Sequence, residues 1–365
     1  DFSGAEDARA KLRILSLSTA KDSLSVTNAT LKEYLRTEPK DPVALRKQAL
    51  ALETDGKVRQ AVEVLQRAQE MNPQNASLQF TLARMIYASG RAEEALRVGW
   101  AARRLAPDDV EGAWILADLT WATRDFTSAF NLYSEVARKR DSDARVWFSL
   151  GEAAIAVGRL DEAERALTRA LGLNPNAVAA ERIPFIQASR DASLAPALSE
   201  AAKKKLDAGE KDVLAAYVLA LVATDFKEAE TRLNQCLLWA PEFSPAKRQL
   251  VIRASGLGSG YDQRIIDLGT QARETYRNDP AMEKAIAAAV YRQGDYARVV
   301  TLLEGVRTAL QADPEYHYYL GMAYRALGRQ AQAVDTLNQA LALGLTGLLA
   351  VEAQTALSSL KPATK

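Results

Sequence analysis

Few side chains in this 365-residue sequence could carry out covalent or metal-dependent chemistry. It contains one histidine, His317, and one cysteine, Cys236, which together cannot supply a zinc site of the usual ligand types. A Ser–His–Asp arrangement would depend on His317, and no Gly-x-Ser-x-Gly turn accompanies it. We therefore expect both residues to be structural, with Cys236 buried as a small hydrophobic residue and His317 packed between helices.

Two further patterns look like functional sites but have simpler explanations. The segment Gly256-Leu257-Gly258-Ser259-Gly260 is similar to a phosphate loop, yet no strand precedes it and no Lys-Ser or Lys-Thr follows it. We expect an inserted loop there. The carboxylate pairs Glu93-Glu94 and Asp161-Glu162 fall in the first turn of predicted helices, where they stabilise the positive end of the helix dipole. The sequence thus predicts no enzyme, no cofactor and no metal site.

The composition restricts the possible partners. Lys and Arg total 47 and Asp and Glu total 46, so the net charge of +1 offers no general attraction to nucleic acid or to an anionic membrane. No stretch of about 18 uninterrupted apolar residues exists, so we expect no direct insertion into a membrane. The chain begins at Asp1, and its compartment stays open: periplasm or cell envelope if a signal was removed before Asp1, cytoplasm otherwise.

A repeat of 34 residues organises the chain. Similar fragments begin at Gly90, Gly158, Gly294 and Gly328, which are separated by 68, 136 and 34 residues. These are multiples of the period typical of helix–turn–helix solenoid units. The same register divides the chain into ten units that end at Gly347 and begin at Ala8, Pro42, Ala76, Val110, Ala144, Val178, Asp212, Ala246, Pro280 and Pro314.

The units resemble the tetratricopeptide repeat family. The best match is the unit from Ala144, with Trp147, Leu150, Gly151, Gly158, Ala163, Ala170 and Pro175 at the signature places. The resemblance implies an all-α, right-handed superhelical solenoid of antiparallel helix pairs. In such pairs, small residues such as Ala83 and Gly321 let crossing helices approach closely, and glycines such as Gly90 end the first helix.

Departures from the pattern predict how the chain is organised. In the unit from Val178, Pro184 falls in the middle of the first helix and Pro196 early in the second, so we expect a kinked, shortened or partly irregular pair over residues 180–205. The next unit fits a start near Glu210. The predicted parts are an N-terminal tail (1–7), a degenerate first unit (8–41), a regular arm (42–177), a degenerate proline-containing unit (178–209), a second arm (210–347), and a capping helix with a tail (348–365).

The family resemblance also implies where a partner would bind, because five places of each first helix line the concave groove in this family. On this sequence they hold rings between charges of both signs: Arg46, Glu53, Phe80, Arg84, Tyr87, Glu111, Trp114, Asp118, Trp121, Arg145, Phe148, Glu152 and Ile155. We predict that the five rings of Phe80, Tyr87, Trp114, Trp121 and Phe148 form one continuous binding patch. The alternative is that they fill the core between helices, as aromatic residues at helical spacing usually do.

A second candidate surface lies near the C-terminus and combines basic and aromatic residues: Lys284, Tyr291, Arg292, Tyr318, Met322 and Arg325. It would suit an acidic peptide or a chain-terminal carboxylate. Chaperone-binding members of the family hold such a carboxylate with Lys and Asn in adjacent units. No unit of this chain has Asn at the ninth place, so that part of the resemblance is absent.

We therefore predict a non-enzymatic scaffold for protein–protein interaction that binds an extended peptide or a helix of another protein. Two alternatives stay open. One is an accessory protein of bacterial exopolysaccharide or envelope assembly and export, with polysaccharide as the ligand on the aromatic residues. The other is the repeat arm of a larger enzyme whose catalytic domain lies outside this sequence.

Overall fold

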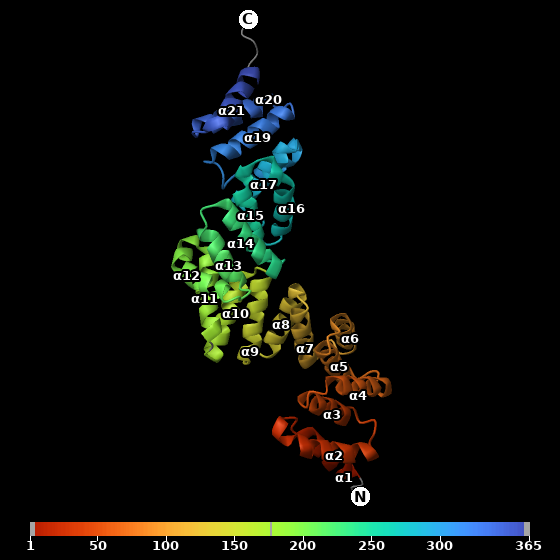
Figure 1. Cartoon of the computed structure of the whole chain (residues 1–365). Helices are drawn as coiled ribbons and strands as arrows, with labels where there is room; N and C mark the ends of the chain where they lie inside the picture. Colours follow the sequence, from red (N-terminus) through yellow and green to blue (C-terminus); the bar gives the residue numbers. More distant parts are fainter. Residues whose placement is uncertain (1–3, 176, 361–365) are drawn as a thin grey trace. The chain divides into compact units, whose positions relative to one another are not determined.

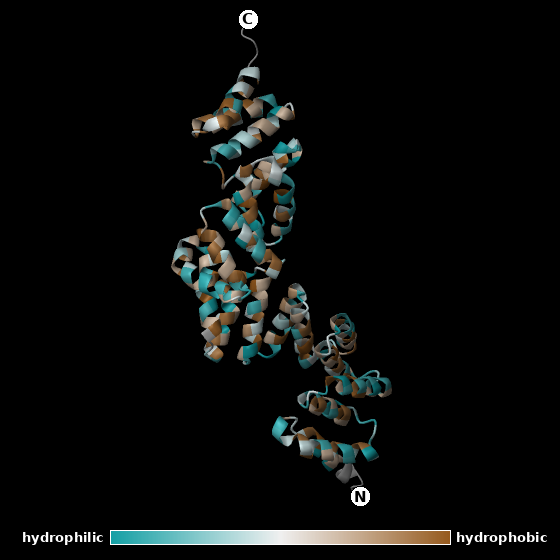
Figure 2. Ribbon diagram, in the orientation of Figure 1, coloured by the Kyte–Doolittle hydropathy of each residue, from teal (hydrophilic) through white to brown (hydrophobic). Residues whose placement is uncertain are grey.

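The computed structural model describes residues 4–175 and 177–360, and within these ranges the chain forms 21 α-helices and no strand (Figure 1). Successive helices form pairs joined by short turns, so the two helices of a pair run antiparallel. Hydrophobic and hydrophilic residues are mixed along the helices, as expected when each buries one face (Figure 2). The predicted all-α repeat fold is confirmed.

The helix bounds follow the 34-residue register closely. The first five pairs are α1 (Gly4–Ser16) and α2 (Leu24–Thr37), α3 (Pro42–Thr54) and α4 (Val58–Met71), α5 (Ala76–Ala88) and α6 (Ala92–Leu105), α7 (Val110–Ala122) and α8 (Phe126–Lys139), and α9 (Ala144–Ala156) and α10 (Leu160–Leu173). The next five are α11 (Ala177–Arg190) and α12 (Ala195–Asp207), α13 (Val213–Val222) and α14 (Phe226–Trp239), α15 (Ser244–Ala254) and α16 (Asp262–Ala272), α17 (Pro280–Arg292) and α18 (Tyr296–Glu304), and α19 (Pro314–Ala326) and α20 (Gln330–Ala342), followed by α21 (Gly347–Leu360).

Capping residues explain why these helices begin and end where they do. Asp109 accepts a hydrogen bond from the backbone N–H of Gly112 at 3.1 Å and so caps α7. Asp41, Asn75, Asp279 and Asp313 cap α3, α5, α17 and α19 in the same way. The predicted terminal glycines have a positive φ, such as 88° at Gly90, which a residue with a side chain adopts only at a cost.

Close packing between the helices of a pair explains the small residues of the repeat. A methyl group at Gly321 would lie 2.8 Å from Cγ of Leu337, so α19 and α20 could not approach as closely with any larger residue. Ala83 is fully buried at the corresponding place of another unit, and Ala95, Ala163 and Ala333 are fully buried at the reciprocal place on the second helices. The predicted role of these positions is confirmed.

The helices group into two compact units. Unit 1 comprises the described residues up to Ala154 together with Arg165–Ala179, and its core includes Leu65, Leu82 and Leu119. Unit 2 comprises Ile155–Glu164 and the described residues from Ala180 onward, and its core includes Ile286 and Val299. In unit 2, α21 covers the last pair, as predicted for a capping helix. Its residues Ala353, Ala356 and Leu357 pack with Tyr318, Leu337 and Leu345.

The proline-containing unit is more regular than predicted. Helix α11 continues through Pro184 over its full length, so the expected shortening of this helix is wrong. Helix α12 starts at Ala195, so Pro196 lies in its first turn, early in the helix as predicted. Proline is tolerated there because the first backbone N–H groups of a helix have no partner within the helix.

The two following units depart from the register in different ways. Helix α14 fits the predicted start near Glu210, but α13 begins only at Val213, where Asp212 caps it. The segment of residues 255–260 is an insertion, as predicted. It forms two short 3₁₀ turns, η3 (Ser255–Leu257) and η4 (Ser259–Tyr261), with no phosphate-loop context of strand and helix.

Candidate functional site

The candidate site of unit 1 is built on one face of α7. Trp114, Asp118 and Trp121 are spaced by four and three residues and therefore share a face. Both indole rings are half-buried and Asp118 is exposed. The other face carries Ala113, Leu116, Ala117 and Thr120, all buried. Because the core takes that second face, the first face stays partly open to solvent. We call Tyr87, Trp114, Asp118, Trp121 and Phe148 the aromatic stripe.

Asp118 is held in place by the second helix of its own pair. The hydroxyl of Tyr133 in α8 donates a hydrogen bond of 2.6 Å to Oδ1 of Asp118. Desolvation by the surrounding protein raises the pKa of Asp118, although the hydrogen bonds from Tyr133 and Trp114 act in the opposite direction. A carboxylate that is exposed in one direction and desolvated in others is expected on a concave surface.

The Asp118 carboxylate also affects Tyr133. Burial, and then the hydrogen bond to Asp118, raise the pKa of the Tyr133 hydroxyl. This hydroxyl stays protonated and continues to donate to Asp118 across the neutral range. The carboxylate is thereby fixed in one orientation between the two tryptophans.

Two arginines lie over the ring of Trp114. The Cζ atoms of Arg140 and Arg145 are each 5.2 Å from the ring centroid, within the range of a cation–π contact. Each guanidinium is also paired with a carboxylate of this chain: Arg140 with Glu111 at 2.6 Å and Arg145 with Asp143 at 2.9 Å. The ring of Trp114 therefore already attracts cations in the free protein.

The remaining members of the stripe come from α5, α7 and α9. Tyr87 is half-buried against the core of unit 1, and Phe148 is half-buried on α9. Trp121 meets the edge of Phe126 with ring centroids 5.1 Å apart. Tyr87, Trp121 and Phe148 are thus anchored at one side and partly open at the other, which is typical of rings at interaction surfaces.

The charged residues along the stripe are mostly engaged with each other. Arg84 makes two hydrogen bonds of 2.6 and 2.8 Å to the carboxylate of Glu53 on the preceding first helix. Arg46 donates to the hydroxyl of Ser77 on the following one. Glu152 is half-buried and interacts within the protein. The contacts of Arg84 and Arg46 join the first helices of two neighbouring repeats, α3 and α5.

Two predicted members of the patch are core residues instead. Phe80 is 1% exposed and fills the space above Gly112, where a methyl group would lie 2.0 Å from Cε2 of the ring. Ile155 is also buried. The prediction that five rings form one continuous exposed patch is therefore wrong for Phe80, because the absent side chain of Gly112 lets this ring enter the core.

The second candidate surface, in unit 2, is not basic in the folded chain. Lys284 pairs with Asp313 at 2.6 Å and with Glu315 at 3.1 Å, and Arg292 pairs with Asp262 at 2.7 Å. These cations are neutralised by the chain itself. Arg325, the remaining cation of this set, is exposed and forms no ion pair with the described residues.

The tyrosines of the second candidate surface also contact other residues of the chain. Tyr318 is 1% exposed and donates to the carboxylate of Glu352 in the capping helix, and burial raises its pKa. Tyr291 packs edge-on against Tyr296, Tyr318 and Tyr319, with centroids 5.6 to 6.3 Å apart. Met322 is half-buried beside them. The expectation of a basic, exposed surface is wrong here because the chain supplies the partners of these groups.

The single cysteine and the single histidine are both buried, as predicted. Cys236 is fully buried, and its Sγ lies 3.5 Å from the carbonyl oxygen of Val213; burial raises the pKa of the thiol. Nε2 of His317 lies 2.9 Å from the carbonyl oxygen of Gln311, and its ring packs against Tyr316. Among residues 4–175 and 177–360, no group of His, Cys, Asp and Glu could hold a metal ion.

No described helix is both long and apolar enough to cross a membrane.

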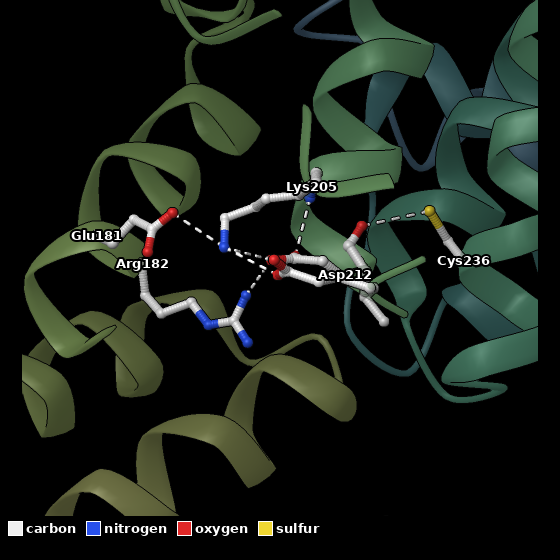
Figure 3. A network of polar contacts seen from close by, with 8 residues as sticks. Glu181, Arg182, Lys205, Asp212 and Cys236 are labelled. Carbon is white, nitrogen blue, oxygen red and sulfur yellow. Dashed lines mark hydrogen bonds and ion pairs between the residues drawn. The ribbon is translucent and has the colours of Figure 1, made fainter. Parts of the chain in front are cut away.

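A network of charges joins α11, α12 and α13 within unit 2 (Figure 3). Asp212 is 5% exposed, accepts from the backbone N–H of Ala215, and pairs with Arg182 and with Lys205. Lys205 also pairs with Glu181 at 2.9 Å. The network explains why α13 begins at Val213: Asp212 serves at once as helix cap and as counter-ion.

Sequence reasoning missed two features. Tyr133 occupies the place where other units have Gly99, Leu167 and Leu337, and a hydroxyl in such a core position needs a partner; this signal could have pointed to Asp118. Unit 2 also has a polar cleft of about 580 Å³, whose walls include the ion pairs Arg190–Asp161 and Arg248–Asp279. It is assembled from segments far apart in the sequence, so no local motif indicates it.

Comparison with protein families supports the repeat assignment. Three segments match family models described as tetratricopeptide repeat, at residues 46–110, 121–181 and 314–344. The first of these contains Arg84 and Tyr87 and the second begins at Trp121. With the observed helix pairs, these matches show tetratricopeptide repeats in the chain. Such repeats suggest a protein-interaction scaffold and do not specify a partner.

A search of curated proteins found no match. Among solved structures, the chain is similar to the APC/C hetero-tetramer Cut9–Hcn1, with a TM-score of 0.47 and 12% identity over 97% of this chain and 88% of that one. It is also similar to a tetratricopeptide repeat protein from Parabacteroides merdae ATCC 43184, with a TM-score of 0.36 and 15% identity over 87% and 97% of the two chains. At these identities the likeness concerns the fold alone.

Proposed function

We propose that this protein is a non-enzymatic scaffold that binds an extended segment or a helix of a partner protein on the aromatic stripe of unit 1. The observation that carries the proposal is the face of α7. It presents two half-buried tryptophans on either side of an exposed aspartate, while the opposite face is taken up by the core. Partly exposed tryptophans supply large contact area at low entropic cost, as interface anchors do.

The distribution of fixed contacts supports a preformed surface. Tyr133 orients Asp118, Glu53 orients Arg84, and Phe126 supports Trp121 from one edge. A surface whose side chains are already ordered loses less entropy when a partner binds. The same residues would also suit stacking of sugar rings, so polysaccharide is the alternative ligand that an experiment must separate from peptide.

The test is a selection from a random peptide library displayed on phage, run beside a panel of soluble polysaccharides. We expect the full chain to select peptides whose binding is lost in the double variant Trp114→Ala/Trp121→Ala. The matched control is Trp100→Ala, since Trp100 is a half-buried tryptophan on α6 outside the stripe. Selected peptides that bind the double variant as well as the wild type would overturn the proposal. Binding of polysaccharide alone would replace it with the alternative.

A further inference from the structure

Near the aromatic stripe, three arginines are paired with carboxylates, whereas one aspartate is not paired with a cation. Arg84 is paired with Glu53, Arg140 with Glu111, and Arg145 with Asp143. Asp118 is bonded only to the neutral hydroxyl of Tyr133 and the neutral indole of Trp114, and among the described residues no cation forms an ion pair with it. Among Arg84, Arg140, Arg145 and Asp118, the charge without an opposite partner is therefore the carboxylate.

An aspartate is an unfavourable choice here unless its charge has a use. An asparagine would accept the same hydrogen bond from Tyr133 without bringing a charge into a desolvated place. Arg84 is near enough to influence the carboxylate, but its guanidinium is committed to Glu53 by two hydrogen bonds. The structure thus holds an oriented carboxylate that has no counter-ion of its own.

The rings beside Asp118 favour the same kind of ligand. Trp114 and Trp121 flank it on the same helix face, and indole is the best of the natural rings for attracting a cation. The chain itself demonstrates this attraction. Two guanidinium groups lie 5.2 Å from the centroid of Trp114, and that of Arg124 lies 6.0 Å from that of Phe126, the ring against Trp121.

We propose that the aromatic stripe takes a lysine or arginine side chain of the partner, with Asp118 as its counter-ion and Trp114 and Trp121 as its walls. This proposal rests on the proposed function of the same surface and specifies the partner as a basic segment. An acidic segment would meet an uncompensated carboxylate and arginines that are already paired. A neutral sugar that covers Asp118 would remove water from its charge without supplying a counter-ion, which is costly.

The experiment repeats the peptide selection on the wild type and on Asp118→Asn, with Asp108→Asn as the control. Asp108 is a fully exposed aspartate in the turn before α7 and lies outside the stripe. Peptides selected by the wild type should be enriched in Lys and Arg. Their affinity should fall about tenfold in Asp118→Asn, the order expected for losing a charge-assisted contact, and should not change in Asp108→Asn.

The possible outcomes separate the two proposals. Peptides that depend on Trp114 and Trp121 but show no enrichment in Lys and Arg, or that bind Asp118→Asn as well as the wild type, would overturn the basic-segment proposal and leave the scaffold surface intact. Failure to select any peptide that depends on the tryptophans would overturn both. Melting curves of the two asparagine variants should match that of the wild type or lie slightly above it, which shows that folding is retained.

Discussion

The aromatic stripe of unit 1 and the basic, aromatic set of unit 2 look alike in the sequence, since both combine rings and charges on first helices. In the folded chain they differ in whether their charged and aromatic side chains have partners within the chain. In unit 2, Lys284 and Arg292 have acidic partners and Tyr318 is buried under α21. In unit 1, no cation of the described residues pairs with Asp118, and Trp114 and Trp121 stay partly open.

The difference shows what separates a structural cluster from a candidate binding surface. Residue types at groove positions are not sufficient, because a neighbouring unit or a capping helix can cover or neutralise them. The side chains that still lack an internal partner are the ones that indicate a binding surface. In the aromatic stripe, the group without an internal counter-ion is the Asp118 carboxylate between two tryptophans. In the basic, aromatic set of unit 2, it is the exposed Arg325.

The capping helix gives the largest expected effect in this comparison. Truncation after Thr346 removes α21 and uncovers Tyr318, Leu337 and Leu345 in unit 2. We expect a loss of about 5 kcal/mol in the free energy of unfolding, since several side chains return to water. Chemical denaturation followed by circular dichroism measures it. An unchanged unfolding curve would show that Tyr318 is not held by a cap and that the second surface is open after all.

Within unit 1, two rings on α5 separate core from surface. Phe80→Ala should cost about 4 kcal/mol because it leaves a cavity above Gly112. Tyr87→Ala should cost clearly less, since Tyr87 is only half-buried. Equal losses, measured by urea unfolding, would place Tyr87 in the core with Phe80 and shorten the proposed surface to α7 and α9.

Arg292 provides a smaller effect in unit 2. Its partner Asp262 is nearly buried, so Arg292→Ala leaves a carboxylate without a counter-ion. We expect a loss of about 2 kcal/mol, below that of a fully buried pair because Arg292 is itself partly exposed. Thermal unfolding tests this. If the variant instead lost peptide binding at unchanged stability, Arg292 would belong to a ligand surface.

Replacing Asp118 should have the smallest effect on stability, and the direction of this effect follows from the raised pKa of the carboxyl group. Desolvation, with the charge of Glu111, raises the pKa of Asp118 above its ordinary value of 3.8 in spite of Tyr133, Trp114 and Arg84. The folded protein therefore holds this proton more tightly than the unfolded chain does. Stability from this group is present below the ordinary pKa and is lost as pH rises through the raised one.

Asp118→Asn removes the loss of stability that accompanies ionisation of Asp118. We expect its melting temperature to exceed that of the wild type slightly at neutral pH and the difference to shrink toward acid, below the ordinary pKa of aspartate. Thermal melts of both proteins at a series of pH values measure the difference. A variant that is less stable than the wild type at neutral pH would mean that the carboxylate has a favourable partner in the free protein.

Much of the fold could be predicted from the sequence because the repeat is local. The period, the cap at Asp109 and the positive φ at Gly90 are decided within a few residues, and the helix bounds follow from them. The cap at Asp212, which starts α13, is local in the same way. The pairing of Asp212 with Arg182 and Lys205 could not be predicted, because it comes from tertiary contacts between helices of unit 2.

The candidate site was less predictable, because it depends on contacts between units. Phe80 is buried through Gly112, one unit further along the chain. The pairs Arg84–Glu53, Lys284–Asp313 and Arg292–Asp262 join residues 29 to 31 apart, close to one period. A search for opposite charges at that separation would have shown that these cations are engaged. Asp118 has no opposite charge 29 to 31 residues away, and Arg84, one full period before it, is already engaged with Glu53.

The most direct test of the account is hydroxyl-radical footprinting of the full chain, with and without a peptide chosen by the library selection. Mass spectrometry reports the oxidation of each aromatic residue. The account predicts that the peptide protects Trp114 and Trp121 and leaves Trp100 and the tyrosines around Tyr291 unchanged. Protection at Tyr291 and its neighbours, with Trp114 and Trp121 oxidised as in the free protein, would contradict it.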